Sequence, residues 1–320
     1  MNGINTKWFI VIGLWIFYPP IHAEPVWIDT DPACGVSRTS DVDDCWALYL
    51  ALQSPELEIR GISTVFGNSN GITTYHKTQE VISRVADSTT KLKIFRGSDQ
   101  KLDNSSIQPT AASQALAKSL RRESLSILAL GPLTNIATLL QTQPSLASQI
   151  HQIIAVAGKR PQSGLRFYPG NTSILHLHDM NFRKDVEAFD IVLNSSIPVV
   201  LIPYELASKI TITSVDLKQL LSINKASQWL ATISEKWLTF WKKDLKVDGF
   251  FPFDSLAVAY AINTQDFQCE NIPAIIERKH SFFVESRDDL IVSHDYKKGR
   301  NVNYCHDVDH GLKSRITSRL

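Results

Sequence analysis

The sequence has no excess of charge of either sign. It contains 33 lysine and arginine residues against 32 aspartate and glutamate residues, mixed along the chain. It therefore lacks the basic stripe that is typical of nucleic-acid-binding proteins, and we expect no nucleic acid among its partners. Internal repeats and low-complexity tracts are absent as well. The 320 residues, 43% of them hydrophobic, are enough to bury a large core in one α/β domain or two smaller ones.

The apolar run near the N-terminus is too short to span a membrane comfortably. It covers the eleven residues from Trp8 to Tyr18, whereas a membrane-spanning helix needs about 20. Lys7 precedes this run, and a Pro-Pro pair and Ala23 follow it, as in a secretory signal peptide. We predict a signal peptide at residues 1–23, a mature domain at residues 24–320, export (periplasmic or secreted), and no stable membrane span after cleavage. The alternative is a buried first strand or helix.

Cysteine is scarce, with four residues in the chain. Cys34 and Cys45 flank the segment GVSRTSDVDD, and Cys269 and Cys305 lie near the C-terminal end. Disulfides persist in exported proteins. Four cysteines allow three pairings, so the pairing stays open, and four buried free thiols are the alternative.

Apolar runs that read as strands alternate with segments of helical spacing. We expect strands at residues 25–29, 59–67, 92–97, 125–130, 150–158 and 197–206, and helices at 43–54, 73–87, 110–122, 132–143 and 184–195. Pro132 is expected in the first turn of its helix. This alternation predicts an α/β protein: a single domain with a mostly parallel open sheet flanked by helices. In such sheets, ligands bind beyond the carboxyl ends of the strands.

Five aspartates gather where the first strand ends and the next helix begins: Asp29, Asp31, Asp41, Asp43 and Asp44. Carboxylates repel one another, by about 4 kcal/mol for a pair at 4 Å and a surface-like dielectric. The positive end of the helix favours Asp43 and Asp44, and helix capping alone is the alternative for these two. A hard cation would offset the repulsion, and Ca²⁺ accepts six to eight oxygen ligands. The Asp-x-Asp that precedes the pair favours a cation site.

The chain resembles the inosine–uridine-preferring nucleoside hydrolase family in five ordered segments. The segments DTDP and DD match the family's opening motif, although ACGVSRTSDV makes the spacer between them about eight residues longer than usual. VFGN, LALGPLTNIATLL, GNTS with DMNFRKDVEAFDIVLNSSIPVVLI, and FPFDSLAVAYAI follow in the expected order. The resemblance covers most of residues 25–265 and fades afterwards. It implies a Rossmann-like nucleoside hydrolase fold and hydrolysis of ribonucleosides to ribose and free base.

The resemblance also assigns roles to individual residues. The Ca²⁺ ligands would be Asp31, Asp44, Asp254 and the backbone carbonyl of Leu130, and Asp31 would also be the general base that activates the calcium-bound water. Asp43 would accept the ribose 2′-hydroxyl, and the remaining sugar hydroxyls would be held by four side chains: Asn68, Asn171, Asp179 and Asn181. Asp29 would orient the other carboxylates through hydrogen bonds.

The sequence departs from the family pattern at the residue before Asp254. The family often has a histidine there, which protonates the leaving base, whereas this chain has Phe253. His176 and His178 are near the sugar-binding segment but do not replace that histidine by spacing. Phe253 could stack on a base. Four other aromatic residues could also do so, but core packing is the more common role of such residues: Trp237, Trp241, Phe250 and Phe251.

The enlarged loop at residues 33–42 has a cysteine at each end. Cys34 follows the Asp-x-Asp turn and Cys45 directly follows Asp44, so their Cα atoms could fall within the roughly 4.4–6.8 Å that a disulfide needs. We predict a Cys34–Cys45 disulfide. The alternative is that Cys45 faces the core and Cys34 has no partner.

Two other functions are kept as alternatives. Phe253 and the enlarged loop are compatible with a catalytically weak nucleoside- or sugar-binding protein on the same scaffold. An Asp-x-Asp after a first strand also occurs in phosphatases of the haloacid-dehalogenase type, although these do not explain GPLTN. The sequence leaves open the preferred base, the role of the segment after residue 265, and the oligomeric state, for which a homo-oligomer is one alternative.

Overall fold

The structure is a computed structural model, which describes residues 23–86, 92–161, 163, 165–167, 175–177, 179–279 and 287–320. Its centre is a nine-stranded sheet with the strand order β10-β9-β11-β8-β5-β4-β1-β2-β3. All neighbouring strands from β11 to β3 are parallel, and β9 is antiparallel to both β10 and β11. The predicted α/β class with a mostly parallel open sheet is confirmed.

The strands of this sheet have the following bounds: β1 Glu24–Thr30, β2 Leu57–Thr64, β3 Ile94–Arg96, β4 Leu125–Ala129, β5 Ile150–Ala155, β8 Val199–Leu201, β9 Phe267–Lys279, β10 Arg287–Val292 and β11 Arg300–Val308. A separate two-stranded sheet pairs β6 (Leu165–Phe167) with β7 (Leu175–Leu177). The sequence did not predict β9 to β11, which add three strands to one edge of the sheet.

Helices cover both faces of the sheet. Their bounds are α1 Asp43–Leu52, α2 Gly71–Val85, α3 Ala111–Leu120, α4 Thr134–Thr142, α5 Met180–Lys184, α6 Val186–Leu193, α7 Tyr204–Ala207, α8 Ser214–Leu220, α9 Lys225–Phe240, α10 Phe253–Ile262 and α11 Leu312–Thr317. Short 3-10 or π turns lie at η1 Pro144–Gln149, η2 Trp241–Leu245 and η3 Thr264–Asp266.

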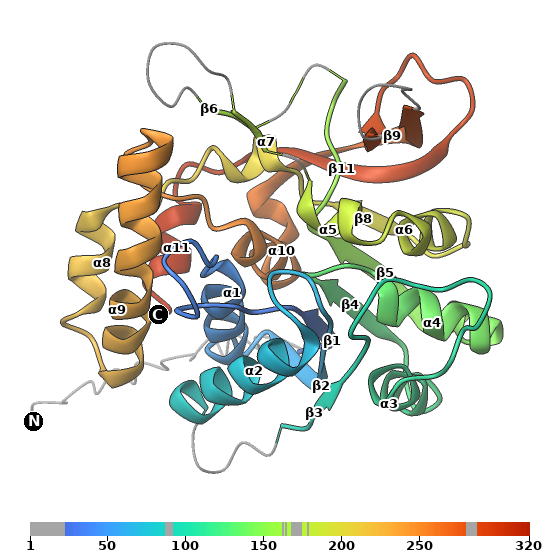
Figure 1. Ribbon diagram of the computed structural model, residues 1–320, viewed down its shortest axis with the longest axis horizontal. Helices are drawn as coiled ribbons and strands as arrows, with labels where there is room; N and C mark the ends of the chain where they lie inside the picture. The colour runs from blue at the N-terminus through green and yellow to red at the C-terminus, as the bar shows by residue number, and fades with distance from the viewer. Residues whose placement is uncertain are drawn as a thin grey trace, which may run out of the picture.

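Two hydrophobic cores lie on opposite faces of the sheet, because successive strand side chains point to opposite sides. On β1, Val26 and Ile28 join the core beneath α1, α8, α9, α10 and α11, whereas Trp27 joins the core beneath α3, α4 and α6. Figure 1 shows α8 and α9 at one end of the molecule and α3 and α4 at the other. The result is a three-layer α/β/α arrangement.

Two expected elements differ from the structure. The helix expected at residues 132–143 begins at Thr134, with Leu133 as its N-cap, so Pro132 lies before the helix rather than in its first turn. The strand expected at residues 197–206 is only Val199–Leu201, and the chain turns into the short helix α7 at Tyr204. Pro203 stands at the N-cap of α7, and its missing N–H is compatible with the end of a strand.

The ends of the parallel strands determine where the expected site residues lie. Asp31 follows β1, Asn68 follows β2 and Leu130 follows β4, and these three strands are neighbours in the order β4-β1-β2. Because the strands are parallel, all three residues leave the sheet at the same edge. Within the described residues, no helix has the length and hydrophobicity needed to cross a bilayer.

Candidate active site and metal centre

Two helices begin side by side at the carboxyl edge of the sheet. Asp43 and Asp44 form the first turn of α1, and Asp254 lies in the first turn of α10. The three side chains each offer a carboxylate oxygen within 4.8 Å of the others, and all three are buried. Both helices are buried on nearly every side, so packing rather than surface charge fixes their positions. The positive ends of two helices partly offset the repulsion of these carboxylates.

Asp31 approaches this cluster from the end of β1. Its backbone N–H donates to Asp44 Oδ1 at 3.1 Å, and its Oδ2 accepts the N–H of Asn68 at 2.7 Å. Asp31 Oδ1 is buried and has no hydrogen-bond partner among the residues that the structure describes. A buried carboxylate oxygen without a partner is costly unless a cation or a donor meets it.

Close backbone approach to Asp31 requires glycine at two positions. A Cβ at Gly67 would lie 1.9 Å from Asp31 Oδ2, and a Cβ at Gly131 would lie 2.8 Å from Asp31 Oδ1. Both glycines stand in the motifs VFGN and GPLTN. These motifs therefore leave room for the Asp31 carboxylate between the ends of β2 and β4.

Hydrogen bonds fix the orientation of the other carboxylates. Asp44 accepts hydrogen bonds from the Thr30 hydroxyl and from Asn68 Nδ2, the latter at 3.1 Å. Asp29 accepts from the Ser63 hydroxyl and from Asn135 Nδ2, the latter at 2.8 Å. These bonds hold the Asp29 carboxylate near the end of β1, two residues before Asp31, and its expected role in orienting the other carboxylates stays a prediction. Its second oxygen, Oδ2, is buried and meets no hydrogen-bond partner within the described part of the chain.

Burial raises the pKa values of all these carboxyl groups. It raises the pKa of Asp29 to about 7 and that of Asp44 to about 6, against hydrogen bonds that lower both. For Asp31, burial and then the charge of Asp44 raise the pKa well above its ordinary value. The pKa of Asp254 is raised well above its ordinary value by burial and then by the charges of Asp43 and Asp44. Without a cation, the cluster therefore holds protons that ordinary aspartates release.

The residues expected to bind the sugar are held by local hydrogen bonds. Asn181 Nδ2 donates to the carbonyl oxygens of Leu130 at 2.7 Å and Val156 at 3.1 Å, which places Asn181 beside the expected backbone ligand. Asp179 caps α5 through the N–H of Phe182. It also accepts the N–H of Gly158 at 2.7 Å.

Burial raises the pKa of Asp179 to about 6. Asn171, His178 and the side chain of His176 lie outside the described residues. The sugar-binding roles stay predictions.

Phe253 belongs to a group of aromatic side chains at the start of α10. Its ring centroid lies 6.1 Å from that of Phe251, 6.4 Å from Tyr204 and 6.5 Å from Trp241. Phe253 is half-buried, whereas the other four candidates for base stacking are buried in the core: Trp237, Trp241, Phe250 and Phe251. Among the five, Phe253 is the residue with exposed surface next to a carboxylate of the cluster.

Sequence reasoning missed three residues that hold the carboxylates. Thr30 donates to Asp44, and Ser63 and Asn135 donate to Asp29. Asn135 had a visible signal, because it ends the GPLTN motif. Thr30 lies between two expected site residues, but nothing in the sequence distinguishes Ser63 from other serines.

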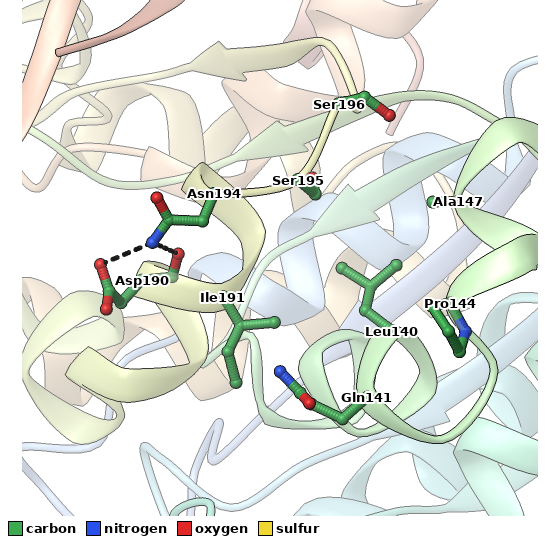
Figure 2. A pocket seen from close by; sticks show the side chains of 9 residues that line it. All are labelled: Leu140, Gln141, Pro144, Ala147, Asp190, Ile191, Asn194, Ser195 and Ser196. Carbon is green, nitrogen blue, oxygen red and sulfur yellow. Dashed lines mark hydrogen bonds between the residues drawn. The ribbon is translucent and has the colours of Figure 1, made fainter.

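A separate hollow of about 400 Å³ lies between the C-terminal ends of α4 and α6 (Figure 2). Its lining includes Pro144, Ser195 and Ser196, which precede β5 and β8, so it opens at the amino ends of the strands. Asp190 is its only carboxylate, and the Asn194 amide donates to the backbone and side-chain oxygens of Asp190 at 2.9 and 3.1 Å. This hollow is at the opposite edge of the sheet from the carboxylate cluster and has no comparable chemistry.

Comparison with known proteins identifies the family. Residues 26–312 match the profile described as inosine-uridine preferring nucleoside hydrolase. The chain belongs to this family. The match extends beyond residue 265, where the recognisable motifs end, and includes the edge strands β9 to β11.

Individual relatives and solved structures agree with this assignment. The chain is 29% identical over 227 residues to the pyrimidine-specific ribonucleoside hydrolase RihA of Photobacterium profundum, covering 63% of this chain and 67% of the relative. It is 27% identical over 278 residues to the probable uridine nucleosidase 2 of Oryza sativa subsp. japonica, covering 78% and 77%.

The solved plant nucleoside hydrolase PpNRh1 has the same fold, with a TM-score of 0.75 at 19% identity over 93% of this chain and 98% of that one. The purine-preferring ribonucleoside hydrolase from Gardnerella vaginalis has a TM-score of 0.72 at 20% identity, covering 92% and 99%.

Family membership establishes the reaction class. The chain is an N-glycosyl hydrolase that acts on ribonucleosides, and the phosphatase alternative is wrong. The family is metal-dependent, and the acidic cluster supplies oxygen ligands for a cation.

The raised pKa values predict how pH changes the stability of the metal-free protein. A carboxyl group whose pKa is higher in the folded state stabilises the fold below its unfolded pKa, and this stabilisation is lost as the pH rises through the folded pKa. For Asp29 the window runs from the ordinary 3.8 to about 7. At about 1.4 kcal/mol per pKa unit, Asp29 alone accounts for as much as roughly 4 kcal/mol.

Thermal unfolding in the presence of a chelator should therefore show a lower midpoint at pH 8 than at pH 5.5. Asp29→Asn keeps an oxygen acceptor for Ser63 and Asn135 and should reduce this difference. A thermal midpoint in chelator that is higher at pH 8 than at pH 5.5 would contradict the raised pKa of Asp29.

Proposed function

We propose that this chain hydrolyses the N-glycosidic bond of ribonucleosides with Ca²⁺ at the carboxylate cluster and Asp31 as the general base. The observation that supports the proposal best is the buried Asp31 Oδ1, which has no hydrogen-bond partner among the described residues. The backbone N–H of the same residue donates to Asp44. An unpaired, oriented carboxylate oxygen can both meet a cation and accept a proton.

The cluster fits a hard cation with many oxygen ligands. Asp43, Asp44 and Asp254 converge within 4.8 Å, and the Leu130 carbonyl follows β4 at the same edge. We propose Asp31, Asp44, Asp254 and the Leu130 carbonyl as the ligands, with Asp43 facing the ribose 2′-hydroxyl. Ca²⁺ suits carboxylate and carbonyl oxygens in a flexible arrangement. Bound calcium would offset part of the negative charge of the carboxylates and would lower the pKa of a water molecule bound to it.

Asp31 performs the proton transfer in this proposal. It accepts a proton from the attacking water, whose oxygen forms a bond to C1′ of the ribose. The C1′–N bond breaks, and its electron pair leaves with the nucleobase. The ribose ring develops oxocarbenium character, as in glycoside hydrolysis generally. Negative charge on the buried carboxylates stabilises this developing positive charge.

Residues around the cluster orient the substrate in this proposal. In this proposal Asn68, Asn171, Asp179 and Asn181 hold the remaining sugar hydroxyls. Asp29, itself held by hydrogen bonds from Ser63 and Asn135, is the proposed supporting group behind the cluster. The half-buried ring of Phe253 offers a face for the base.

Asp44→Ala should abolish calcium binding, because a site with several carboxylates depends on each charged ligand. Isothermal titration of the chelator-stripped protein with calcium measures this effect. Asp190→Ala is a suitable control because Asp190 is a carboxylate at the opposite edge of the sheet and should leave the affinity unchanged. If the Asp44 variant binds calcium as tightly as the wild type, the proposed metal site is wrong.

The absence of a histidine before Asp254 predicts a strong dependence on the leaving group. General acid catalysis contributes about 10²–10⁴ in rate, so a nitrophenyl riboside, which needs little protonation, should react faster than inosine or uridine by roughly that factor. Release of base and nitrophenol from a substrate panel, with and without chelator, measures this ratio. Similar rates would require another acid and would direct mutagenesis to His176 and His178. Base release that is unaffected by the chelator would contradict the proposed role of calcium.

We also propose that the protein is exported after removal of residues 1–23. The two disulfides support this, since such bonds persist in oxidising compartments. Expression in the native host, followed by N-terminal sequencing of the extracytoplasmic fraction, should give a mature chain that begins at Glu24. Recovery of the intact N-terminus from the cytoplasm would contradict export.

A further inference from the structure

The loop between Asp31 and Asp43 does little to hold the carboxylates at its two ends together. Eleven residues, 32–42, separate Asp31, just after β1, from Asp43 at the start of α1, so carboxylates of the cluster lie at both ends. A longer loop leaves its ends freer to separate, although the cost rises only slowly with length. Like charges at these ends favour separation whenever no cation is bound.

A disulfide shortens this connection. Cys34 and Cys45 are bonded, with their Cα atoms 6.4 Å apart, which confirms the predicted pair. Only Pro32 and Ala33 separate Asp31 from Cys34, and Cys45 directly follows Asp44. Through the disulfide, Asp31 and Asp44 are therefore joined by a short covalent route that bypasses residues 35–43. Both cysteines are fully buried, and Cys45 packs in the core with α1.

The exposed part of the loop, residues 35–39, has weaker contacts with the body of the protein, whereas Val42 at the end of the loop is buried in the core. Arg38 forms an ion pair with Asp244 at 3.5 Å, but both side chains are more than 40% exposed. Surface ion pairs of this kind contribute little, typically 0–1 kcal/mol. Ser37 and Ser40 hydrogen-bond to each other at the exposed tip of the loop. The covalent bond at the base of the loop is thus its strongest constraint.

We propose that the Cys34–Cys45 disulfide positions the metal centre. It compensates for the long loop by holding Asp31 and Asp44 at a fixed spacing against their mutual repulsion. Its loss weakens cation binding more than it weakens the fold. This inference rests on the proposed calcium site and adds two positioning residues to it.

The second disulfide is a matched control. Cys269 and Cys305 face each other across β9 and β11 and are 36 residues apart in sequence, against 11 for Cys34 and Cys45. Strands β8, β5 and β4 lie between β11 and β1, which leads to the cluster. The chain-entropy model predicts that the longer loop contributes more to global stability. The two disulfides should therefore rank in opposite order for stability and for cation affinity.

The experiment compares Cys34→Ala/Cys45→Ala with Cys269→Ala/Cys305→Ala. Calcium affinity is measured by isothermal titration, and stability by urea unfolding in chelator. The first variant should bind calcium about tenfold more weakly or worse, the range seen when groups that support metal ligands are lost. The second should keep the wild-type affinity while losing at least as much stability.

Two outcomes of this experiment would overturn the proposal: an unchanged calcium affinity in the first variant, or an equal loss of calcium affinity in both variants. Absence of calcium binding by the wild type overturns the calcium site itself, and the proposal with it.

Reduction of the wild-type protein provides a second measurement, which applies even if the first variant does not fold. Coupling between two equilibria is reciprocal, so a tenfold weaker affinity after reduction means that saturating calcium makes Cys34–Cys45 tenfold harder to reduce. For a two-electron couple this is a shift of about 30 mV. Equilibration with thiol buffers, alkylation and peptide mapping follow both disulfides. Calcium should make the reduction potential of Cys34–Cys45 more negative and leave that of Cys269–Cys305 unchanged. Equal shifts in the two potentials would overturn the proposal.

Discussion

The burial of several like charges at one point is the constraint on which the rest of this structure depends. Asp43, Asp44 and Asp254 converge in the interior, and Asp31 reaches the same region from the end of β1. Burial alone would keep such groups protonated, as their raised pKa values show. Two helix N-termini, a set of donors and a metal ion are the means by which a fold can keep them charged.

The open parallel sheet supplies this environment at one edge. Parallel strands end together, so residues far apart in sequence leave β1, β2 and β4 at neighbouring points. The donors that orient the carboxylates come from those same strands and the helices that follow them: Thr30 from β1, Ser63 from β2 and Asn135 from α4. The nearly complete burial of α1 and α10 then holds the two acidic helix starts in place.

The long first loop shows how a surface feature is kept compatible with such a centre. Insertions in loops cost little entropy, so the loop itself is tolerated. The bond between Cys34 and Cys45 separates the exposed part of the loop from its two ends, which carry the carboxylates. The tip can therefore vary in sequence and conformation without a direct effect on the spacing between Asp31 and Asp44.

Local sequence patterns determined much of this protein. Alternating strands and helices gave the α/β class, and the motifs around Asp31, Asp44, Leu130 and Asp254 indicated the family, because each of these signals needs only a few consecutive residues. Cys34 and Cys45 could be paired because both lie next to expected site residues. Strands β9 to β11 were missed because the recognisable motifs end before them, and because β11 pairs with β8, which lies about a hundred residues earlier in the chain.

Tertiary structure alone decided which atoms meet. It brought Asp43 together with Asp44 and Asp254, because two helices begin at the same point, and placed Asp31 beside Asp44. It engaged Asp179 as a helix cap and buried four of the five aromatic candidates, leaving Phe253 half-exposed. It also selected Ser63 as a partner of Asp29, since hydrogen bonds between neighbouring strands depend on register, which no single segment of sequence contains.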